Sequence, residues 1–279
     1  ISHGVEKRSH VRSRIIANAL CDLIKKSDSV IIMGHRMSDL DAIGSAIGVL
    51  RICKICGVPA VIAVNSDATL AGPLLKTFID AGEGHNFIPP DQTLDVITPR
   101  TLLIVVDTYQ KRLLESQKIY EKCKRVVVID HHRMAVGHID NPLLLYHEPY
   151  ASSASELVCE LLQFLPKEDN ITALEAQALL AGIMLDTRSF ALHVGVRTFE
   201  AAAYLRKQYL TEAGVSIGDK LNQLRMDEAS RLLLETDQPI ESIARQIGVE
   251  NTKYFFVLFK KFKGMTPRQF RCKAETSPL

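Results

Sequence analysis

The sequence predicts an α/β fold, a doubly wound parallel sheet, followed by a small all-helical domain. Two observations predict the sheet: nearly continuous aliphatic runs of strand length, and amphipathic stretches of helical period between them. Aliphatic strands that alternate with helices are typical of a parallel sheet covered on both faces. Because the strand pattern ends near residue 208, we divide the chain into domains at residues 1–207 and 208–279.

The first domain begins with a helical pattern, in which apolar residues recur at helical spacing from Val11 to Ile24. The runs expected to form strands are residues 30–33, 60–64, 101–106 and 125–129. The stretches expected to form helices are residues 42–56, 71–81, 110–122, 151–165 and 172–184. In the second domain, the apolar pattern indicates short helices separated by Asp237-Gln238-Pro239 and by Gly248.

The composition is that of an ordinary soluble globular protein, with 279 residues, 47% hydrophobic and 24% charged. The formal net charge of +2 gives no overall field that would require a nucleic-acid or membrane partner. No segment approaches the roughly 20 apolar residues that a spanning helix needs, and the N-terminus has no signal-peptide pattern. We therefore expect a cytoplasmic protein. Because the sequence begins with Ile1 rather than Met, we interpret it as a processed or partial product.

The six cysteines are scattered along the chain, and their spacing predicts no disulfide framework. Cys53 and Cys56 fit the pattern C-x-x-C, but no second cysteine or histidine pair lies at zinc-finger spacing. We therefore expect two ordinary helix cysteines in a reducing compartment.

Most of the candidate metal ligands follow predicted strands, and one follows a predicted helix. They are His35, Asp39 and Asp41 after strand 30–33, Asp107 after strand 101–106, Asp130, His131 and His132 after strand 125–129, and Asp186 after helix 172–184. In an open parallel sheet, the loops at the carboxyl ends of the strands converge around the ligand site. If these strands are neighbours, we expect the side chains to share one pocket.

Carboxylates crowded in one pocket repel one another and are costly to ionise without a counter-charge. Divalent cations would make the cluster favourable, and oxygen ligands mixed with imidazole suit Mn²⁺ better than a thiolate-seeking ion. The alternative is that each Asp or His merely caps a helix or stabilises a turn, which would account for any single motif. The set of motifs together favours a metal site.

These motifs resemble those of the DHH phosphoesterase family, in particular the DHH portion of GdpP-type cyclic di-AMP phosphodiesterases. The resemblance covers about residues 5–207 and is carried by "GHRMSDLDAIGSAIG", "VVDT", "VVVIDHH", "YHEPYASSASELVCELLQ" and "GIMLDTRSF". It implies a metal-dependent phosphodiesterase with two Mn²⁺ ions, acting on a cyclic dinucleotide or a related small phosphoester.

The resemblance also implies a role for each candidate residue, with Asp107 as a carboxylate that bridges the two ions. The other implied ligands are His35 and Asp39 for one ion, and Asp41, His131 and Asp186 for the second. His132 would contact the scissile phosphate or the leaving group, and Asp130 would orient the neighbouring imidazoles. Two such ions would neutralise charge on the attacking and leaving oxygens of an in-line displacement.

The sequence departs from the family pattern at two places. Tyr109 stands where the family often has His or another polar group. Nothing after residue 207 resembles the family's substrate-binding domain with its Gly-Gly-Gly-His-like loop, and the family's upstream membrane helices are missing too. We therefore expect catalytic machinery that is present and substrate capture that is impaired.

A predicted helix N-terminus lies close to these motifs in the sequence. Ser153 and Glu156 have the spacing of a capping box at the start of helix 151–165. A helix N-terminus can instead bind phosphate, and this alternative stays open.

Residues 214–271 resemble the C-terminal part of AraC/XylS-type transcription regulators. The match runs through "LNQLRMDEASRLLLETDQPIESIARQIGVENTKYFFVLFKKFKGMTPRQFR", a linker helix followed by a helix-turn-helix at about 238–262. The residues implied to contact duplex DNA are Asn251, Thr252, Lys253, Lys260, Lys261 and Lys263. Such regulators normally carry two helix-turn-helix units, whereas Tyr209–Leu221 matches only the end of the first. Phe256 and Val257 replace the Ser and Arg that the family often has.

Three hypotheses about function follow. The leading one is a Mn²⁺-dependent phosphodiesterase, and the second is a DNA-binding regulator whose N-terminal domain senses a nucleotide. The third is that two truncated pieces are joined without a shared function. A separate alternative for the C-terminal helices is an appendage that packs on the catalytic domain, with lysines that are merely solvated. Whether the chain forms a homodimer stays open.

Overall fold

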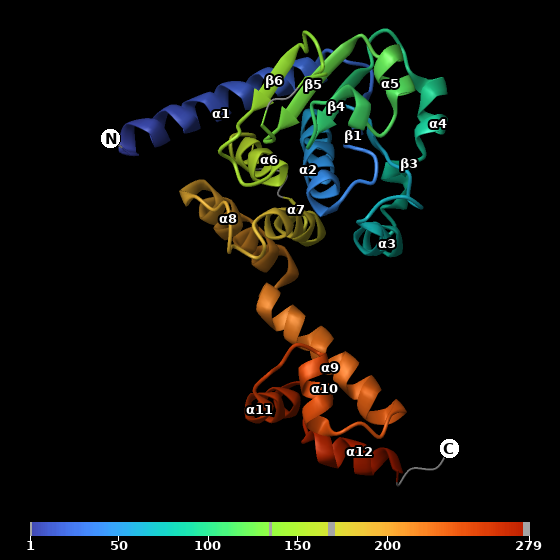
Figure 1. Ribbon diagram of the computed structural model, residues 1–279, viewed down its shortest axis with the longest axis vertical. Helices are drawn as coiled ribbons and strands as arrows, with labels where there is room; N and C mark the ends of the chain where they lie inside the picture. The colour runs from blue at the N-terminus through green and yellow to red at the C-terminus, as the bar shows by residue number, and fades with distance from the viewer. Residues whose placement is uncertain (1, 134–135, 167–170, 276–279) are drawn as a thin grey trace. The chain divides into compact units, whose positions relative to one another are not determined.

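The computed structural model describes residues 2–133, 136–166 and 171–275, with the backbone alone for residues 2–10 and 273–275. It divides into two compact units, residues 1–212 and 213–279 (Figure 1). The boundary expected after residue 207 falls inside helix α8 (Val196–Ala213), which is followed by Gly214 with a φ of 67°. Among the described residues, none of the helices combines the length and the apolar character needed to cross a membrane.

A six-stranded parallel sheet forms the centre of the first unit, in the order β3-β2-β1-β4-β5-β6. Its strands are β1 (Val30–Met33), β2 (Ala60–Ala63), β3 (Phe87–Ile88), β4 (Leu102–Val106), β5 (Arg125–Asp130) and β6 (Leu144–His147). The chain runs outwards from β1 to β3, returns to β4, and then runs outwards to the other edge. The prediction of a doubly wound parallel sheet is therefore confirmed, and its switch point lies between β1 and β4. The short edge strands β3 and β6 were not predicted.

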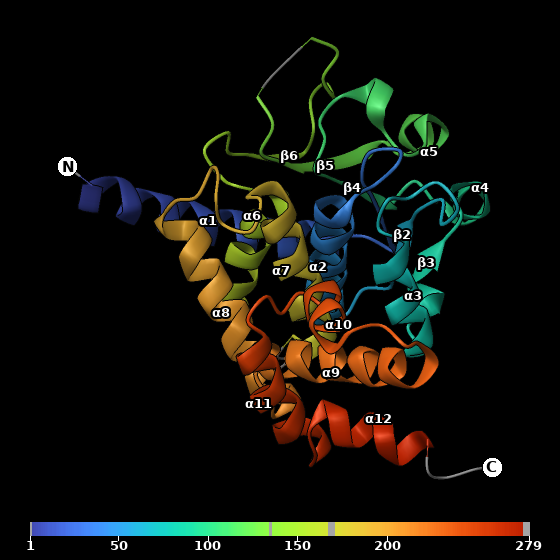
Figure 2. The ribbon, with the colours of Figure 1, turned by 60° about the horizontal axis from the view of Figure 1, so that its bottom comes forward.

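Helices cover the sheet in layers. Those of the first unit, besides α8, are α1 (Ser2–Lys25), α2 (Leu40–Cys56), α3 (Gly72–Asp80), α4 (Pro90–Thr93), α5 (Gln117–Lys122), α6 (Ala154–Gln163) and α7 (Ala173–Asp186). Helix α2 packs against β1, β2 and β4, and α6 packs against β5. Helix α7 packs on both α2 and α6, and the three lie together in Figures 1 and 2.

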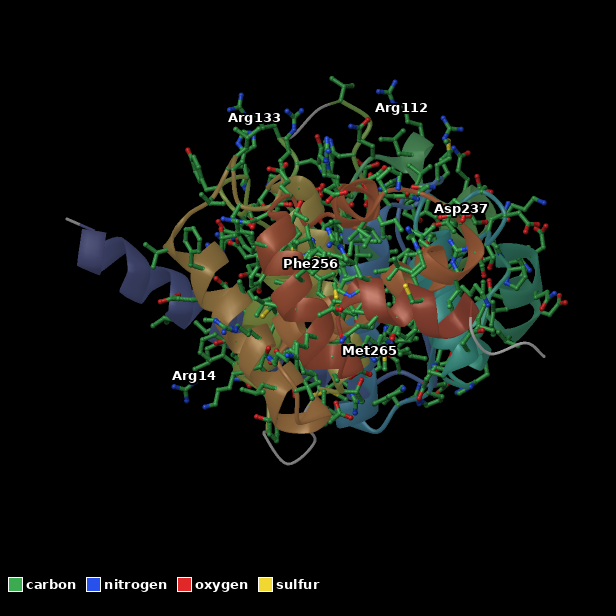
Figure 3. The ribbon with its side chains drawn as sticks, turned by 90° about the horizontal axis from the view of Figure 1, so that it is seen from below. Arg14, Arg112, Arg133, Asp237, Phe256 and Met265 are labelled. Carbon is green, nitrogen blue, oxygen red and sulfur yellow. A yellow bond between two sulfur atoms is a disulfide. The ribbon has the colours of Figure 1, made fainter. Side chains whose placement is uncertain are left out.

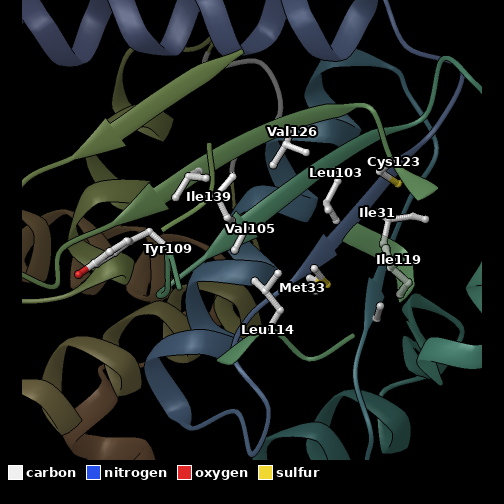
Figure 4. Close-up of a cluster of buried hydrophobic side chains, with 12 residues drawn as sticks. Ile31, Met33, Leu103, Val105, Tyr109, Leu114, Ile119, Cys123, Val126 and Ile139 are labelled. Carbon is white, nitrogen blue, oxygen red and sulfur yellow. The ribbon is translucent and has the colours of Figure 1, made fainter. Parts of the chain in front are cut away.

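The face of the sheet opposite to α2 is covered mainly by loops and the short helix α5. Alternate residues of the strands, among them Ile31, Leu103 and Val126, contribute to one buried hydrophobic cluster there (Figure 4). Because side chains alternate between the faces of a strand, their neighbours in sequence face α2 and α6. Both faces are thus buried, as the nearly continuous aliphatic strands predicted.

The segment 110–122 is less helical than expected. It forms the 3₁₀ turn η3 (Lys111–Leu113) and then α5, which begins only at Gln117. Gln110 and Leu114 make isolated β-bridges to His138 and His35, so their backbone pairs with other segments instead of continuing a helix. Two further 3₁₀ turns, η1 (Gly84–Asn86) and η2 (Leu94–Val96), flank β3 and α4.

A disulfide joins Cys21 of α1 to Cys56 at the end of α2. The expectation that Cys56 is an ordinary helix cysteine is therefore wrong, whereas Cys53 is a buried free thiol. Cysteine spacing reports only local patterns, whereas packing of α1 against α2 brings together residues 35 positions apart.

The second unit is all-helical, as predicted. It contains α9 (Ile217–Glu235), α10 (Ile240–Gln246), α11 (Thr252–Lys263) and α12 (Pro267–Glu275). A hydrophobic cluster that includes Met226, Ile243 and Phe255 joins α9, α10 and α11. The turn between α10 and α11 passes through Gly248, whose φ of 78° lies in the left-handed region that glycine adopts readily.

Candidate metal centre

The carboxyl ends of β1, β4 and β5 bring the candidate ligands together. His35 follows β1, Asp107 follows β4, and Asp130 ends β5, and these strands are paired neighbours in the sheet. Asp107 has a φ of 56°, in the left-handed region that a non-glycine residue rarely adopts. Its amide still donates to Ile129 O at 2.9 Å, so the turn begins directly at the last β4–β5 hydrogen bond. Such backbone strain is concentrated at functional sites.

One group of donor atoms lies between β1 and β4. His35 Nε2 is 3.5 Å from Asp107 Oδ2 and 3.9 Å from Asp39 Oδ1. One ligand atom from each of these three residues lies within 4.8 Å of the others. This is the set expected to hold the first ion.

A second group lies beside the first and shares Asp107 with it. His131 Nε2 is 3.3 Å from Asp107 Oδ1, 3.2 Å from Asp186 Oδ2 and 3.8 Å from Asp41 Oδ2. Asp41, His131 and Asp186 form a further set of donors within 4.8 Å. The two carboxylate oxygens of Asp107 therefore face different histidines, as a carboxylate between two ions would.

Asp130 holds the imidazole of His132. Asp130 Oδ1 lies 2.8 Å from His132 Nδ1 and accepts hydrogen bonds from the amides of His131 and His132 at 2.9 and 3.2 Å. Asp130 is fully buried, whereas the side chain of His132 is 53% exposed. The other ring nitrogen, Nε2, is thereby left for a ligand. The structure shows a direct Asp130 side-chain contact with the His132 ring, and only a backbone contact with His131.

The N-terminus of α6 binds Asp41. Ala154 N donates to Asp41 Oδ2 at 2.7 Å, and Ser155 N donates to Asp41 Oδ1 at 2.8 Å. Ser153 caps the helix by accepting from Glu156 N at 3.0 Å. Because these amides bind an internal carboxylate, they are occupied, and the alternative of phosphate binding there loses its donors. Glu156 binds Ser152 instead of completing the capping box.

Asp39 also has a capping role, which was the alternative to a ligand role. Its Oδ1 accepts from Asp41 N at 2.9 Å and from Ala42 N at 3.1 Å at the start of α2. A cap and a metal ligand are compatible, because a carboxylate has a second oxygen and further lone pairs.

Close packing of α7 against α2 and α6 places Asp186. A Cβ atom added to Gly182 would lie 2.3 Å from Ser155 Oγ and 2.8 Å from Asp41 Oδ1. Gly182 precedes Asp186 by one helical turn, so the contact that it permits sets the approach of Asp186 to His131. Gly182 lies within the motif "GIMLDTRSF", but its role was not predictable from the sequence, since its contacts come from distant segments.

The electrostatics of the cluster favour added positive charge. Burial would lower the pKa of both His35 and His131, but their carboxylate neighbours, Asp107 first, outweigh burial and raise each pKa to about 11. Burial, together with the charges of Asp107 and Asp186, raises the pKa of Asp41. The pKa of Asp107 is lowered, because the two imidazoles outweigh the effect of burial. Without a metal ion, the carboxylates thus keep both histidines protonated. A divalent cation bound between them would supply this positive charge instead.

Three buried polar atoms of this centre have no hydrogen-bond partner within the described parts of the chain. They are Asp107 Oδ1, Asp130 Oδ2 and His131 Nε2. Buried polar atoms are nearly always paired, so unpaired ones require an explanation. Carboxylate oxygens and imidazole nitrogens are the donors that Mn²⁺ and similar ions take. The residues present therefore fit a metal centre.

The second unit presents some of its predicted DNA contacts on one exposed face. Lys253, Val257, Lys260 and Lys261 are all exposed on α11, at spacings that place them on one side of the helix. Asn251 caps α11 by accepting from Tyr254 N at 3.0 Å, which accounts for its side chain without DNA. The lysines on this face are thus exposed, whereas the side chain of Asn251 is already engaged in the helix cap.

Two further predicted contacts lie on α11 as well. The side chain of Thr252 is half-buried at the first helical position. Lys263 forms an ion pair with Asp227 at 2.5 Å and is therefore engaged within the unit. Lys261 is paired as well, with Asp219 at 3.5 Å, but its side chain is 65% exposed, compared with 21% for Lys263.

The sequence is similar to those of known cyclic di-AMP phosphodiesterases. It is 47% identical over 210 residues to a protein named "Cyclic-di-AMP phosphodiesterase GdpP" from Geobacillus thermodenitrificans, covering 74% of this chain and 32% of the relative. A protein of the same name from Bacillus subtilis is 42% identical over the same lengths. The chain thus spans about a third of the length of these relatives.

Further similarities involve the fold and the second unit. An exopolyphosphatase-related protein from Bacteroides fragilis has the same fold, with a TM-score of 0.58, 18% identity, and coverage of 79% of this chain and 65% of that one. Residues 197–273 match a helix-turn-helix domain. The "HTH-type transcriptional activator RhaR" of Enterobacter is 33% identical over 123 residues, covering 42% of this chain and 44% of the relative.

The family model that matches the site itself is described as the DHH family, N-terminal domain, and it spans residues 29–183. This range contains β1, β4 and β5 and all the candidate ligands except Asp186. With more than half of its length matched and the motif side chains gathered at one edge of the sheet, this chain belongs to the DHH family.

Proposed function

We propose that the first unit is a Mn²⁺-dependent phosphodiesterase that hydrolyses cyclic di-AMP or a related small phosphoester. The observation that carries the proposal is the position of Asp107, whose two carboxylate oxygens face His35 and His131 at 3.5 and 3.3 Å. The names of the relatives at 47% and 42% identity support the choice of substrate.

Each group of donors would hold one ion, with Asp107 shared between them. The ligands proposed are His35, Asp39 and Asp107 for one ion, and Asp41, Asp107, His131 and Asp186 for the other. Two such ions would supply Lewis-acid chemistry, because they would neutralise the charge that develops on the attacking and leaving oxygens.

His132 is proposed to act on the leaving group or the scissile phosphate. Asp130 binds its Nδ1 atom, and this hydrogen bond raises the pKa of His132. This contact leaves Nε2 as the ring atom that would face the substrate, where the protonated imidazole would donate a hydrogen bond or transfer a proton to the leaving oxygen. Asp130 orients His132 and does not itself touch the substrate.

The test uses the purified full chain, Mn²⁺ and cyclic di-AMP, with the products followed by chromatography. We expect hydrolysis that stops when the metal is removed with a chelator and returns when Mn²⁺ is restored. Asp107→Ala is expected to abolish the reaction. Asp91→Ala, at a carboxylate that is 85% exposed and outside the site, is the matched control and is expected to retain it. Full activity in Asp107→Ala would rule out the assignment.

A second function, binding of duplex DNA, is favoured by the exposed lysines of α11 and by the helix-turn-helix match over residues 197–273. We infer that Lys260 and Lys261 lie near phosphates, with Lys253 towards a groove. Binding to duplex DNA, measured by fluorescence anisotropy at several salt concentrations, tests this. Lys260→Ala with Lys261→Ala should weaken binding and reduce its salt dependence by about one unit of slope per lysine. Lys76→Ala, in the first unit, is the matched control.

A further inference from the structure

A large cavity adjoins the candidate metal centre in the first unit. Its volume is about 830 Å³, and its lining includes His131, His132 and Asp186 of the centre. The rest of the lining comes from Arg133, residues 149–152 and residues 193–195. A cavity of this size exceeds what a phosphate group needs and falls in the range of small-molecule ligand sites.

Hydrogen bonds hold the first wall of the cavity, residues 131–133, which follow β5. The hydroxyl of Tyr109 donates to Arg133 O, and His147 Nε2 donates to His132 O. Tyr109 is the residue at which the chain departs from the family pattern, and it is buried beneath this wall. The path of residues 132–133 is therefore fixed from two sides. Figure 3 shows the Arg133 side chain extending outwards at the rim of the unit.

The other two walls of the cavity, residues 149–152 and residues 193–195, are anchored as well. Glu148 N donates to Asp130 O at 3.1 Å and Ala151 N donates to Glu148 O at 3.0 Å, so the turn that carries Tyr150 is tied to the end of β5. Gly195 N donates to Thr198 Oγ1 at 3.0 Å, and Thr198 is in turn bound to the buried Glu156 at 2.7 Å. The cavity is thus a built feature of the unit.

Tyr150 is the aromatic side chain in this lining, and it is 96% exposed. An aromatic ring on an anchored turn provides a flat apolar surface at small entropic cost, and nucleobases stack on such rings. Arg133 adds a permanent positive charge, and His193 is a further exposed polar group at the same cavity. A flat ring, a cation and an adjacent centre for phosphoester cleavage together match one ligand class, a nucleotide.

We propose that this cavity binds a nucleoside of the phosphodiester substrate, with its base stacked on Tyr150 and Arg133 close to its phosphates. The assignment rests on the proposed phosphodiesterase function and extends it, since it makes Tyr150 a determinant of preference for nucleotides over simple phosphoesters.

The test compares wild type, Tyr150→Ala and Tyr150→Phe with two substrates, cyclic di-AMP and methyl 4-nitrophenyl phosphate, in Mn²⁺. The quantity measured is the ratio of kcat/KM for the dinucleotide to kcat/KM for the methyl ester. We expect Tyr150→Ala to lower this ratio about ten-fold, within the range found when one stacking ring is removed. Tyr150→Phe keeps the ring and should stay within about two-fold of wild type. Tyr254→Ala, which removes a half-exposed tyrosine of the second unit, is the matched control.

An unchanged ratio in Tyr150→Ala would overturn the assignment while leaving the metal-centre proposal intact. If wild type cleaves neither substrate, the proposed function fails, and equilibrium binding of AMP in the presence of Ca²⁺ decides the cavity separately. A dissociation constant that rises about ten-fold in Tyr150→Ala, but not in Tyr150→Phe, would support the nucleoside site. Absence of AMP binding, or the same affinity in all variants, would overturn it.

Discussion

His131 Nε2 lies 3.3 Å from Asp107 Oδ1, and neither atom has a hydrogen-bond partner among the residues that the structure describes. A donor and an acceptor this close and this buried would ordinarily align into a hydrogen bond. Both atoms instead point towards the same space, which Asp186 and Asp41 also border. This arrangement is what a shared cation would require.

Asp107→Asn is expected to lower Mn²⁺ affinity at least about 100-fold, because loss of a metal's outer-sphere partners alone costs 10- to 100-fold. The substitution keeps the shape of the side chain but removes its charge from both donor groups. Isothermal titration calorimetry with Mn²⁺ measures the effect. Asp91→Asn is the matched control at an exposed carboxylate, and equal affinities in the two variants would exclude Asp107 as a ligand.

Mn²⁺ affinity is expected to rise with pH between about pH 6 and 8. His35 and His131 each have a pKa raised to about 11, so without metal both carry a proton throughout this range. A ligating imidazole must be neutral, so binding releases protons, and each one contributes on the order of a ten-fold gain in affinity per pH unit. Titrations at several pH values measure the slope. His85→Gln, at an exposed histidine, should leave the slope unchanged, and a pH-independent affinity would contradict the prediction.

Gly182→Ala is expected to lower the free energy of unfolding by about 1–3 kcal/mol, the usual cost of overpacking a core. The new Cβ would lie 2.3 Å from Ser155 Oγ and 2.8 Å from Asp41 Oδ1, so α7 must move and take Asp186 with it. Mn²⁺ affinity should therefore fall too, which a purely structural glycine would not cause. Chemical denaturation and metal titration measure the two effects. Gly72→Ala is the control, since a Cβ there meets nothing within 4 Å, and equal behaviour of the two variants would refute the close-packing role.

Arg197→Met is expected to destabilise the first unit by about 3–5 kcal/mol, because it leaves a buried carboxylate without its cation. Arg197 binds both oxygens of Glu160, which is 5% exposed and also accepts from Tyr146 at 3.1 Å. This pair connects α8 to α6 and so supports the wall at residues 193–195. Thermal or urea unfolding measures the change. Lys76→Met removes the cation of an exposed pair and should have little effect, and a similarly small effect of Arg197→Met would show that Glu160 needs no partner.

Much of the fold was predictable because strand and helix periods are local properties of the sequence. The aliphatic run at residues 101–106 appears as β4, the fully buried central strand that Asp107 follows. The segment 110–122 was predicted less well, because Gln110 and Leu114 pair with distant backbone. The disulfide between Cys21 and Cys56 was missed for a related reason, since it depends on how two helices pack.

The candidate site was predictable in its residue types and less so in its supports. Asp107 directly follows β4 and His131 directly follows β5, so their convergence follows from strand adjacency. The α6 amides that bind Asp41 and the close approach at Gly182 depend on contacts between remote segments. No periodicity in the sequence reports such contacts.

We propose above all that six side chains form one centre for two ions, namely His35, Asp39, Asp41, Asp107, His131 and Asp186. Anomalous diffraction at the manganese edge, from crystals of the full chain grown with Mn²⁺, tests it most directly. We expect two peaks at the carboxyl ends of β1, β4 and β5, with Asp107 contacting both and His35 and His131 on opposite sides of it. A single peak away from Asp107, or no peak in this region at saturating Mn²⁺, would show that these side chains do not form a two-ion centre.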